Sequence, residues 1–173
     1  MTVSTVPAND RNHPSIAPDL SFASVFHADT VMVLGERETK LSVVAKLVQR
    51  LSNTGRLGVN QTNEIIHRIT FRESLASTAF GRGLAFPHLR TPHVKNFIGS
   101  IAILPSGVPF DSNDGAETKL VFLTLSPYAS REHHTQLLSR LVSLLSNKAA
   151  AVQLIKNENA TAFHRTLCRF DAR

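Results

Sequence analysis

The spacing of the apolar residues changes twice along this chain, and that change constrains the fold more than any other feature. The strongest signal is the run Leu-Val-Phe-Leu-Thr-Leu over residues 120–125. A β-strand that is apolar at nearly every position is typical of a sheet covered on both faces. Two further short apolar runs, at residues 83–86 and 97–104, lie between turn-rich segments and predict more strands.

Helical periodicity flanks this block of strands on both sides. Apolar side chains recur three and four residues apart, and residues typical of helix starts and stops lie at the ends of these segments. The expected helices cover residues 41–51, 60–73, 130–145, 148–157 and 159–169. Helices before and after a block of strands predict an α/β sandwich, in which a mixed, mostly buried β-sheet is flanked by helices on both faces.

Length and composition fit a single domain. With 173 residues, of which 42% are hydrophobic, the chain can bury one well-formed core but not two. Residues 1–19 contain three prolines and almost no bulky apolar side chains, a composition typical of a flexible tail. We therefore expect a flexible N-terminal tail at residues 1–19 and one domain over residues 20–173.

Charge, cysteine content and hydropathy argue against several classes of protein. The net charge is +6, but the 19 Lys and Arg residues are scattered, without the basic runs and interleaved aromatics of a nucleic-acid-binding protein. A single cysteine, Cys168, rules out an internal disulfide and suits a reducing compartment. No apolar run approaches the ~18 residues of a membrane span, and no signal peptide is recognisable. We expect a cytoplasmic protein that does not insert into membranes.

A histidine follows one of the predicted strands. Residues 80–88 read Phe-Gly-Arg-Gly-Leu-Ala-Phe-Pro-His, and Pro87 cannot donate to a strand ladder, so His88 is expected at the end of the strand. Between residues 72 and 95 a single acid, Glu73, faces four bases, which predicts a site that attracts an anion. These bases are Arg72, Arg82, Arg90 and Lys95. The alternative is a structural histidine that caps a strand.

Small and hydroxylic residues near His88 can complete an anion site. Gly81 and Gly83 let the backbone approach a ligand closely or adopt a positive φ. Ser77 and Thr78 offer hydroxyl and amide donors. Together with the local arginines, these four residues predict a phosphate-binding cradle.

A second histidine lies in register with an apolar stripe. His134 shares a helix face with Leu137, Leu141 and Leu145 and lies in the first turn, so it is expected to face the sheet. A helix N-terminus favours a neutral imidazole and a bound phosphate. The alternative, that His134 merely ends the apolar stripe, is equally open from the residues alone.

Other chemistries find little support. A zinc site built from His88, His93, His133 and His134 lacks a close cysteine pair and a His-Glu-x-x-His helix. The chain also has no Gly-x-Ser-x-Gly elbow and no Walker-type phosphate loop. We therefore expect no bound metal and no nucleotide hydrolysis.

Several ordered motifs resemble a known family. Arg72-Glu73, then Ser77-Thr78, then residues 80–88 are similar to the phosphorylation-site motif of EIIA domains of the mannitol/fructose type, or type 2. These domains belong to the bacterial phosphoenolpyruvate-dependent phosphotransferase system and include stand-alone nitrogen-regulatory proteins. The resemblance covers roughly residues 20–168 and includes Gly107-Val-Pro-Phe-Asp111 and His134-x-x-Leu-Leu-x-x-Leu.

The resemblance implies a phosphocarrier. His88 matches the phosphoryl acceptor, His134 the second active-site histidine, and Arg72 an arginine that stabilises the phosphate. The donor in this family is HPr or its nitrogen-branch counterpart, and the acceptor is a cysteine of an EIIB domain or, in regulation, a target protein. No cofactor is implied, because Arg72, the nearby hydroxyls and amides and the helix turn at His134 can neutralise the phosphoryl oxygens.

Both partners have to reach the same imidazole, so His88 is expected in a shallow depression with an apolar rim formed by Phe80, Phe86 and Leu89. Phe86 and Leu89 stand where the family usually has smaller residues. These departures favour an alternative, an EIIA-like regulatory module that acts by protein contact with little or no phosphoryl transfer. The lack of a fused EIIB motif in this chain favours the stand-alone regulatory branch.

Overall fold

The computed structural model describes residues 17–35, 37–157 and 159–172. The tail predicted at residues 1–19 therefore lies mostly outside the described residues. The helices are α1 (Phe22–Val25), α2 (Lys40–Asn53), α3 (Val59–Leu75), α4 (Arg131–Ser146), α5 (Lys148–Ile155) and α6 (Ala160–Asp171). The strands are β1 (Phe26–Val33), β2 (Ala79–Gly81), β3 (Leu84–Ala85), β4 (His88–Thr91), β5 (Ile98–Val108) and β6 (Thr118–Pro127). Among these residues no helix is both long and apolar enough to cross a membrane.

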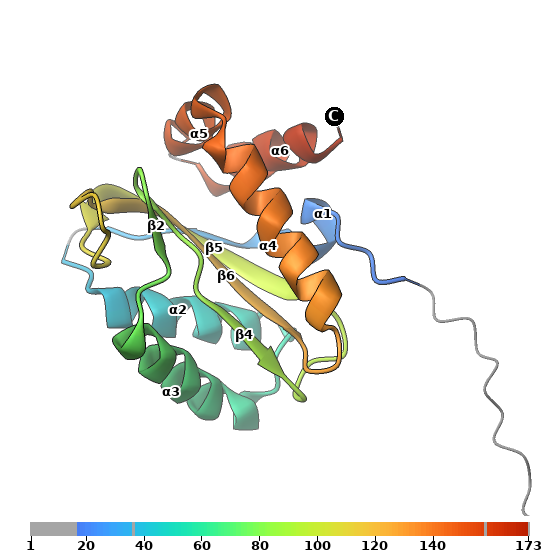
Figure 1. Ribbon diagram of the computed structural model, residues 1–173. Helices are drawn as coiled ribbons and strands as arrows, with labels where there is room; N and C mark the ends of the chain where they lie inside the picture. The colour runs from blue at the N-terminus through green and yellow to red at the C-terminus, as the bar shows by residue number, and fades with distance from the viewer. Residues whose placement is uncertain (1–16, 36, 158, 173) are drawn as a thin grey trace, which may run out of the picture.

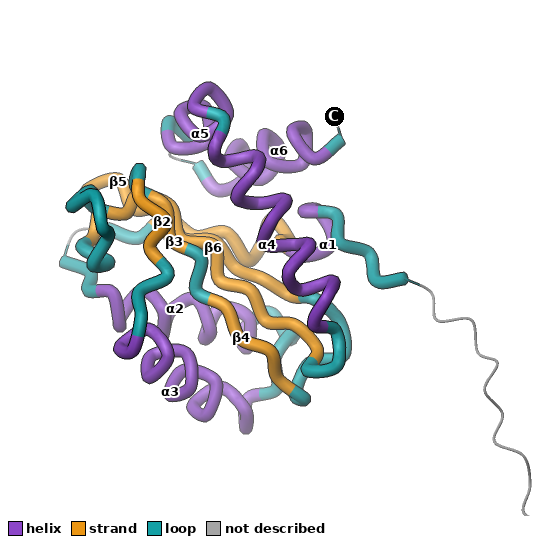
Figure 2. Tube along the Cα trace, in the orientation of Figure 1, coloured by secondary structure: helices purple, strands orange, loops and turns teal. Residues whose placement is uncertain are grey.

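The strands form one mixed sheet in the order β1-β5-β6-β3-β2, with β4 also paired to β6 (Figures 1 and 2). Strand β6 runs antiparallel to β5 and parallel to both β3 and β4. In register, Leu84 of β3 lies opposite Leu120 and His88 of β4 opposite Thr124. Strands β3 and β4 therefore continue one another along the same side of β6.

Helices cover both faces of this sheet, as the apolar runs predict. Side chains of β6 alternate, so that Leu120 and Phe122 pack with α1, α4, α5 and α6, whereas Val121 and Leu123 pack with α2 and α3. Figure 1 shows these two helical layers on opposite sides of the strands. The mixed sheet between two helical layers confirms the predicted fold class.

The N-termini of α3 and α4 both lack the side-chain cap that the sequence predicts. Helix α3 begins at Val59 rather than at the predicted Asn60 cap, because the Gly58 carbonyl already accepts from the amide of Gln61 at 3.1 Å. Helix α4 begins after Ser130, as expected, but the Ser130 side chain caps no amide. The first turn of α4 therefore keeps amides without a side-chain partner.

The strand pairing does not end at Pro87, and this corrects the prediction. Pro87 lacks an N–H and so leaves a gap between β3 and β4, but its carbonyl still accepts from the amide of Thr124 at 3.0 Å. Pairing with β6 resumes at the next residue, and His88 is the first residue of β4. The imidazole thus lies midway along the path that β3 and β4 form beside β6, rather than at the end of a strand.

Candidate functional site

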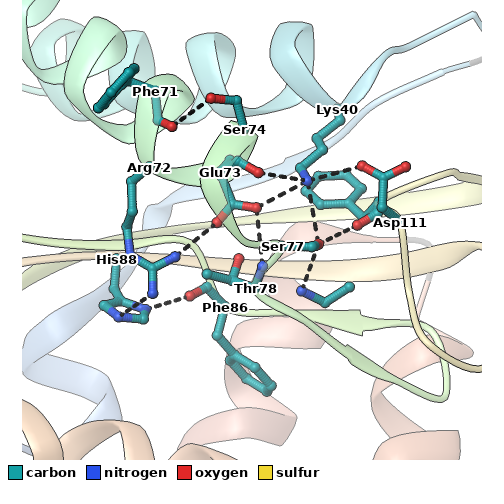
Figure 3. A network of polar contacts seen from close by, with 12 residues as sticks. Lys40, Phe71, Arg72, Glu73, Ser74, Ser77, Thr78, Phe86, His88 and Asp111 are labelled. Atoms are coloured by element: carbon teal, nitrogen blue, oxygen red, sulfur yellow. Dashed lines mark hydrogen bonds and ion pairs between the residues drawn. The ribbon is translucent and has the colours of Figure 1, made fainter.

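The imidazole of His88 is held in one tautomer by the backbone. Its Nδ1 lies 2.8 Å from the carbonyl oxygen of Phe86 (Figure 3). A carbonyl oxygen can only accept, so Nδ1 carries the proton and Nε2 keeps its lone pair. The residue is half-buried and lines two surface cavities, so Nε2 is the available nucleophilic nitrogen.

Arg72 stands beside this nitrogen. It lies in the last turn of α3, and its Nη2 is 3.3 Å from Nε2 of His88. The Arg72 side chain remains 39% exposed, which leaves it able to contact an incoming anion. The structure therefore brings Arg72 and His88 together although 16 residues separate them in the chain.

His134 packs against His88 from the other side. The two ring centroids are 5.2 Å apart, and Nδ1 of His134 lies 2.6 Å from the hydroxyl oxygen of the buried Ser126. The inward orientation expected from the leucine stripe is correct, because His134 is only 7% exposed. The sequence offered no signal for Ser126, since only the packing of α4 against the end of β6 brings its hydroxyl to the imidazole.

Both imidazoles are held neutral. Burial lowers the pKa of His134 to about 4, and the nearby charges of His88, Arg90 and Arg72 act in the same direction. Burial also lowers the pKa of His88; its hydrogen bond to Phe86 and the Glu73 carboxylate oppose that shift, while Arg72 adds to it. A neutral His88 is the form that can act as a nucleophile.

A buried ionic network holds Arg72 in place, and Figure 3 shows it. The Glu73 side chain is fully buried and lies 3.5 Å from Nη1 of Arg72 and 3.3 Å from Nζ of Lys40. The same carboxylate accepts from the amide of Thr78 at 3.1 Å, and Lys40 also contacts Asp111 at 3.2 Å. Sequence reasoning missed Lys40, although Glu73 and Asp111 both lie in the motifs it singled out.

Ser77 and Thr78 lie in this network. The Ser77 hydroxyl donates to the carbonyl of Phe110 and lies 3.3 Å from Nζ of Lys40. Its proton is therefore committed to the backbone. The Thr78 hydroxyl is buried without a hydrogen-bond partner in the described part of the chain, while the Thr78 amide is bound to Glu73. These contacts favour a role for Ser77 in supporting the site.

The two glycines of the predicted cradle do not lie at His88. Gly81 and Gly83 flank the turn between β2 and β3 with φ of 91° and 78°. Leu84 pairs four positions before His88 along β6, which places this turn roughly 13 Å away along the strand. A Cβ at Gly81 would meet Asp114 at 2.9 Å, so its neighbours are acidic. The structure therefore does not bring Gly81 and Gly83 together with His88, and their positive φ values serve the tight turn.

The predicted apolar rim is only partly present. Leu89 is half-buried and lines a cavity at His88, whereas Phe80, although 48% exposed, lines neither of the cavities that reach His88. Phe86 is 6% exposed and stacks on Phe122 with ring centroids 5.9 Å apart, which makes it a core residue. Its ring packs inward against Phe122 and the side chains of α4 and α6, so Phe86 does not contribute to an exposed rim.

Two cavities meet at His88. One, of about 370 Å³, is lined by Arg72, His88, Leu89, Arg90, Tyr128, Arg131, His134 and Thr135. The other, of about 490 Å³, follows the outer face of α4 and is lined by His88, His134, Thr135, Leu138, Ser139, Val142 and Ser143. Within the described ranges, no three His, Cys, Asp or Glu side chains gather as a metal site requires. The imidazole is accessible from a basic cavity and from a largely apolar one.

Fold and site together define a class of protein: an α/β sandwich with a neutral histidine, flanked by an arginine and a second buried histidine, beside a basic surface cavity. A family model described as phosphoenolpyruvate-dependent sugar phosphotransferase system, EIIA 2, matches residues 24–169. The chain belongs to this family, which confirms the resemblance seen in the motifs. Membership supports a phosphocarrier role in the phosphotransferase system.

Relatives in this family fall into regulatory and sugar-specific groups. A nitrogen regulatory protein of Pseudomonas aeruginosa is 31% identical over 131 residues, which cover 76% of this chain and 82% of that protein. A fructose-specific EIIABC component of Bacillus subtilis is 32% identical over 133 residues, 77% of this chain but only 21% of that protein. The chain thus matches one part of a longer sugar-specific protein and most of a regulatory one.

Solved structures agree with the fold. The nitrogen regulatory protein IIA-Ntr of Neisseria meningitidis has a TM-score of 0.75 and 26% identity, covering 84% of this chain and 98% of its own. The mannitol IIA of Escherichia coli has a TM-score of 0.67 and 20% identity, covering 81% and 96% of the two chains. At that identity the second likeness shows the fold alone.

Proposed function

We propose that this protein is a phosphocarrier that accepts a phosphoryl group on Nε2 of His88 from an HPr-like carrier. It then passes the group to a cysteine of an EIIB domain or uses its phosphorylation state to regulate a target protein. The observation that carries the proposal is the fixed tautomer of His88: Nδ1 is bound to the Phe86 carbonyl, and Nε2 lies beside Arg72. The lowered pKa of His88 keeps this nitrogen unprotonated.

The transfer uses groups already in place. The lone pair of Nε2 forms the new N–P bond in line, while the bond from phosphorus to the carrier's imidazole breaks and its electron pair stays on that imidazole. The positive charge that develops on the His88 ring is stabilised by the Nδ1–H bond to Phe86. Arg72 then turns its N–H groups from Nε2 to the phosphoryl oxygens, where a charge-assisted contact is strong.

His134 has a supporting role in this proposal. When Ser126 donates to Nδ1 of His134, the proton of the neutral ring lies on Nε2. With the ring 5.2 Å from that of His88, this N–H can donate to the phosphoryl group. The buried hydroxyl thereby selects the tautomer that stabilises the product.

The proposed partners rest on the relatives. A solved complex joins the mannitol IIA of Escherichia coli to its phosphorylated IIB enzyme, and that IIA has a TM-score of 0.64 and 20% identity to this chain. The two cavities that meet at His88 leave the imidazole accessible to such a protein. We place the protein in the cytoplasm, where phosphoenolpyruvate is formed and where a reduced Cys168 is expected.

A second candidate function is regulation by contact, with little phosphoryl transfer. The likeness to a nitrogen regulatory protein over 82% of its length favours it. Leu89, half-buried in the basic cavity, would then act as a contact for the target protein. A target whose binding is unchanged by His88→Ala, together with no labelling from any carrier, would decide for this alternative.

Radiolabelling tests the phosphocarrier directly. Incubation with labelled phosphoenolpyruvate, enzyme I and the HPr-like carrier of the same organism should label the protein in an acid-labile, base-stable form, as a phosphoramidate. The His88→Ala variant should lose all label, while His93→Ala, an exposed histidine paired with Glu64, should keep it. Persistent acid-labile labelling of His88→Ala would overturn the assignment.

A further inference from the structure

The cavity of about 370 Å³ beside His88 is strongly basic. Three of its lining residues are arginines, Arg72, Arg90 and Arg131, and none is acidic. Arg72 already stands next to the histidine, where it can stabilise a phosphoryl group. Arg90 and Arg131 therefore call for a separate explanation.

Arg90 is held toward the cavity. It lies two positions after His88 on β4, so both side chains leave the same face of the strand. Its Nη1 donates to the carbonyl of Tyr128 at 3.0 Å, and its guanidinium lies 5.3 Å from the centre of the Tyr128 ring. This preorganised guanidinium loses little freedom when it binds a carboxylate.

Arg131 occupies a place that costs stability. It is the first residue of α4 and is exposed, where the helix dipole already places partial positive charge. Because Ser130 provides no side-chain cap, the amides of this first turn add to the positive potential. A cation kept at an uncapped helix N-terminus is more easily explained by binding than by folding.

The acids nearby do not cancel this charge. Glu73 is buried and committed to Lys40 and Arg72. Glu64 on α3 is paired with Arg68 and His93. Glu132 lies next to Arg131 on α4 but does not line the cavity. The surface around the imidazole therefore presents a net positive charge to an approaching protein.

We propose that the protein carrier that docks at His88 presents an acidic face, with carboxylates that pair with Arg90 and Arg131. This inference rests on the proposed phosphocarrier function and specifies its partner. Guanidinium–carboxylate pairs are bidentate and directional, so they orient the partner as well as attract it. A carrier with a basic docking face would meet like charges, which slow encounter and select against it.

The largely apolar cavity along α4 completes this docking surface. It begins at His88 and continues past Leu138 and Val142. A partner that fits both cavities has apolar side chains on one side of its phosphorylated residue and acidic ones on the other. The basic cavity then sets the rate of encounter and the orientation of the partner, and the apolar cavity supplies contact area.

Salt dependence of phosphoryl transfer tests the inference. The second-order rate constant for transfer from the phosphorylated HPr-like carrier of the same organism is measured by rapid quench at 25 to 300 mM NaCl. For the wild type we expect the rate to fall about tenfold over this range, because screening removes the attraction. Arg90→Gln/Arg131→Gln should lower the low-salt rate about tenfold and flatten its salt dependence, and Arg90→Lys/Arg131→Lys should restore most of that dependence.

A matched variant controls for net charge. Arg165→Gln/Arg169→Gln removes two exposed arginines of α6, which line neither cavity at His88, and should behave as the wild type. If His88 is labelled but the wild-type rate rises with salt, the inference that the partner has an acidic face is wrong. The same holds if the glutamine variants match this control. A protein that is labelled by no carrier would instead overturn the phosphocarrier function itself.

Discussion

At the scale of single residues, two imidazoles in contact have different surroundings and therefore different properties. His88 is half-buried and bound through Nδ1 to a backbone carbonyl, so its free nitrogen faces the surface cavities. His134 is buried and bound to a serine hydroxyl. The cost of burial, together with the charges of Arg90, Arg72 and of His88 when it is protonated, lowers the pKa of His134 to about 4.

This neutrality makes the stability of the protein depend on pH. The pKa of His134 is about 4 in the folded state and near 6.5 when unfolded, so between these values the unfolded chain binds more protons. The free energy of unfolding should therefore fall as the pH falls from 6.5 to 4, by at most roughly 1.4 kcal/mol per pH unit for this residue. His88, whose pKa is also lowered, adds to the same trend.

Urea denaturation between pH 4 and pH 8 measures this dependence. His134→Gln should reduce the slope of stability against pH, because the group that must bind the proton is gone. Thr135→Ala, an exposed change in the same helix turn, should keep the slope of the wild type. Equal slopes in the wild type and His134→Gln would show that burial does not hold this imidazole neutral.

At the scale of elements, the site depends on a junction of α2, α3 and the segments that follow β5 and α3. Lys40 at the start of α2 contacts Glu73 on α3 and Asp111 after β5. The Glu73 carboxylate also binds the Thr78 amide, which fixes the chain as it leaves α3 for β2. Arg72 is positioned at His88 only because these elements meet at one buried carboxylate.

Glu73→Gln should break this junction. Removing one partner of a buried ionic network leaves uncompensated charge, so the free energy of unfolding should fall by roughly 3 kcal/mol. Because the Glu73 charge raises the pKa of His88, the variant should also titrate His88 at lower pH, measurable by NMR. Glu64→Gln, at an exposed pair on the same helix, should change neither quantity appreciably. An unchanged His88 titration in Glu73→Gln would limit Glu73 to a structural role.

At the scale of the whole molecule, the sheet joins two separate apolar layers. Phe163 of α6 is fully buried and lies 6.2 Å from the ring of Phe122 on β6, whose neighbours along the strand face α2 and α3. Packing on the α6 side is thus connected to the other layer through a single strand. The prediction of one domain over residues 20–173 requires the two layers to unfold together.

Phe163→Ala tests that requirement. Loss of a fully buried ring should lower the free energy of unfolding by about 3 to 5 kcal/mol. If the domain is one cooperative unit, the slowest-exchanging amides of α2 should lose as much protection against hydrogen exchange as those of α6. Phe170→Ala, half-buried on the same helix, should cost less. Unchanged protection in α2 would divide the chain into two units.

The sequence by itself determined the fold class, helices α2 to α6 and the histidines at the candidate site, because these depend on local spacing, whereas the single turn of α1 was not predicted. Leucines at helical intervals place His134 on an inward face, and the apolar run at residues 120–125 requires cover on both sides. The same local reading also places Arg72 in the last turn of its helix. Such features follow from backbone geometry that extends over a few residues.

Only the tertiary structure decided which groups surround His88. Lys40 reaches the site through a contact between α2 and α3, and Ser126 through the packing of α4 against the end of β6, whereas Gly81 lies away from it although it is seven residues from His88. Phe86, two residues from His88, belongs to the core. Residues along an extended chain separate by about 3.3 Å each, and whether a side chain reaches the surface depends on which elements pack over it.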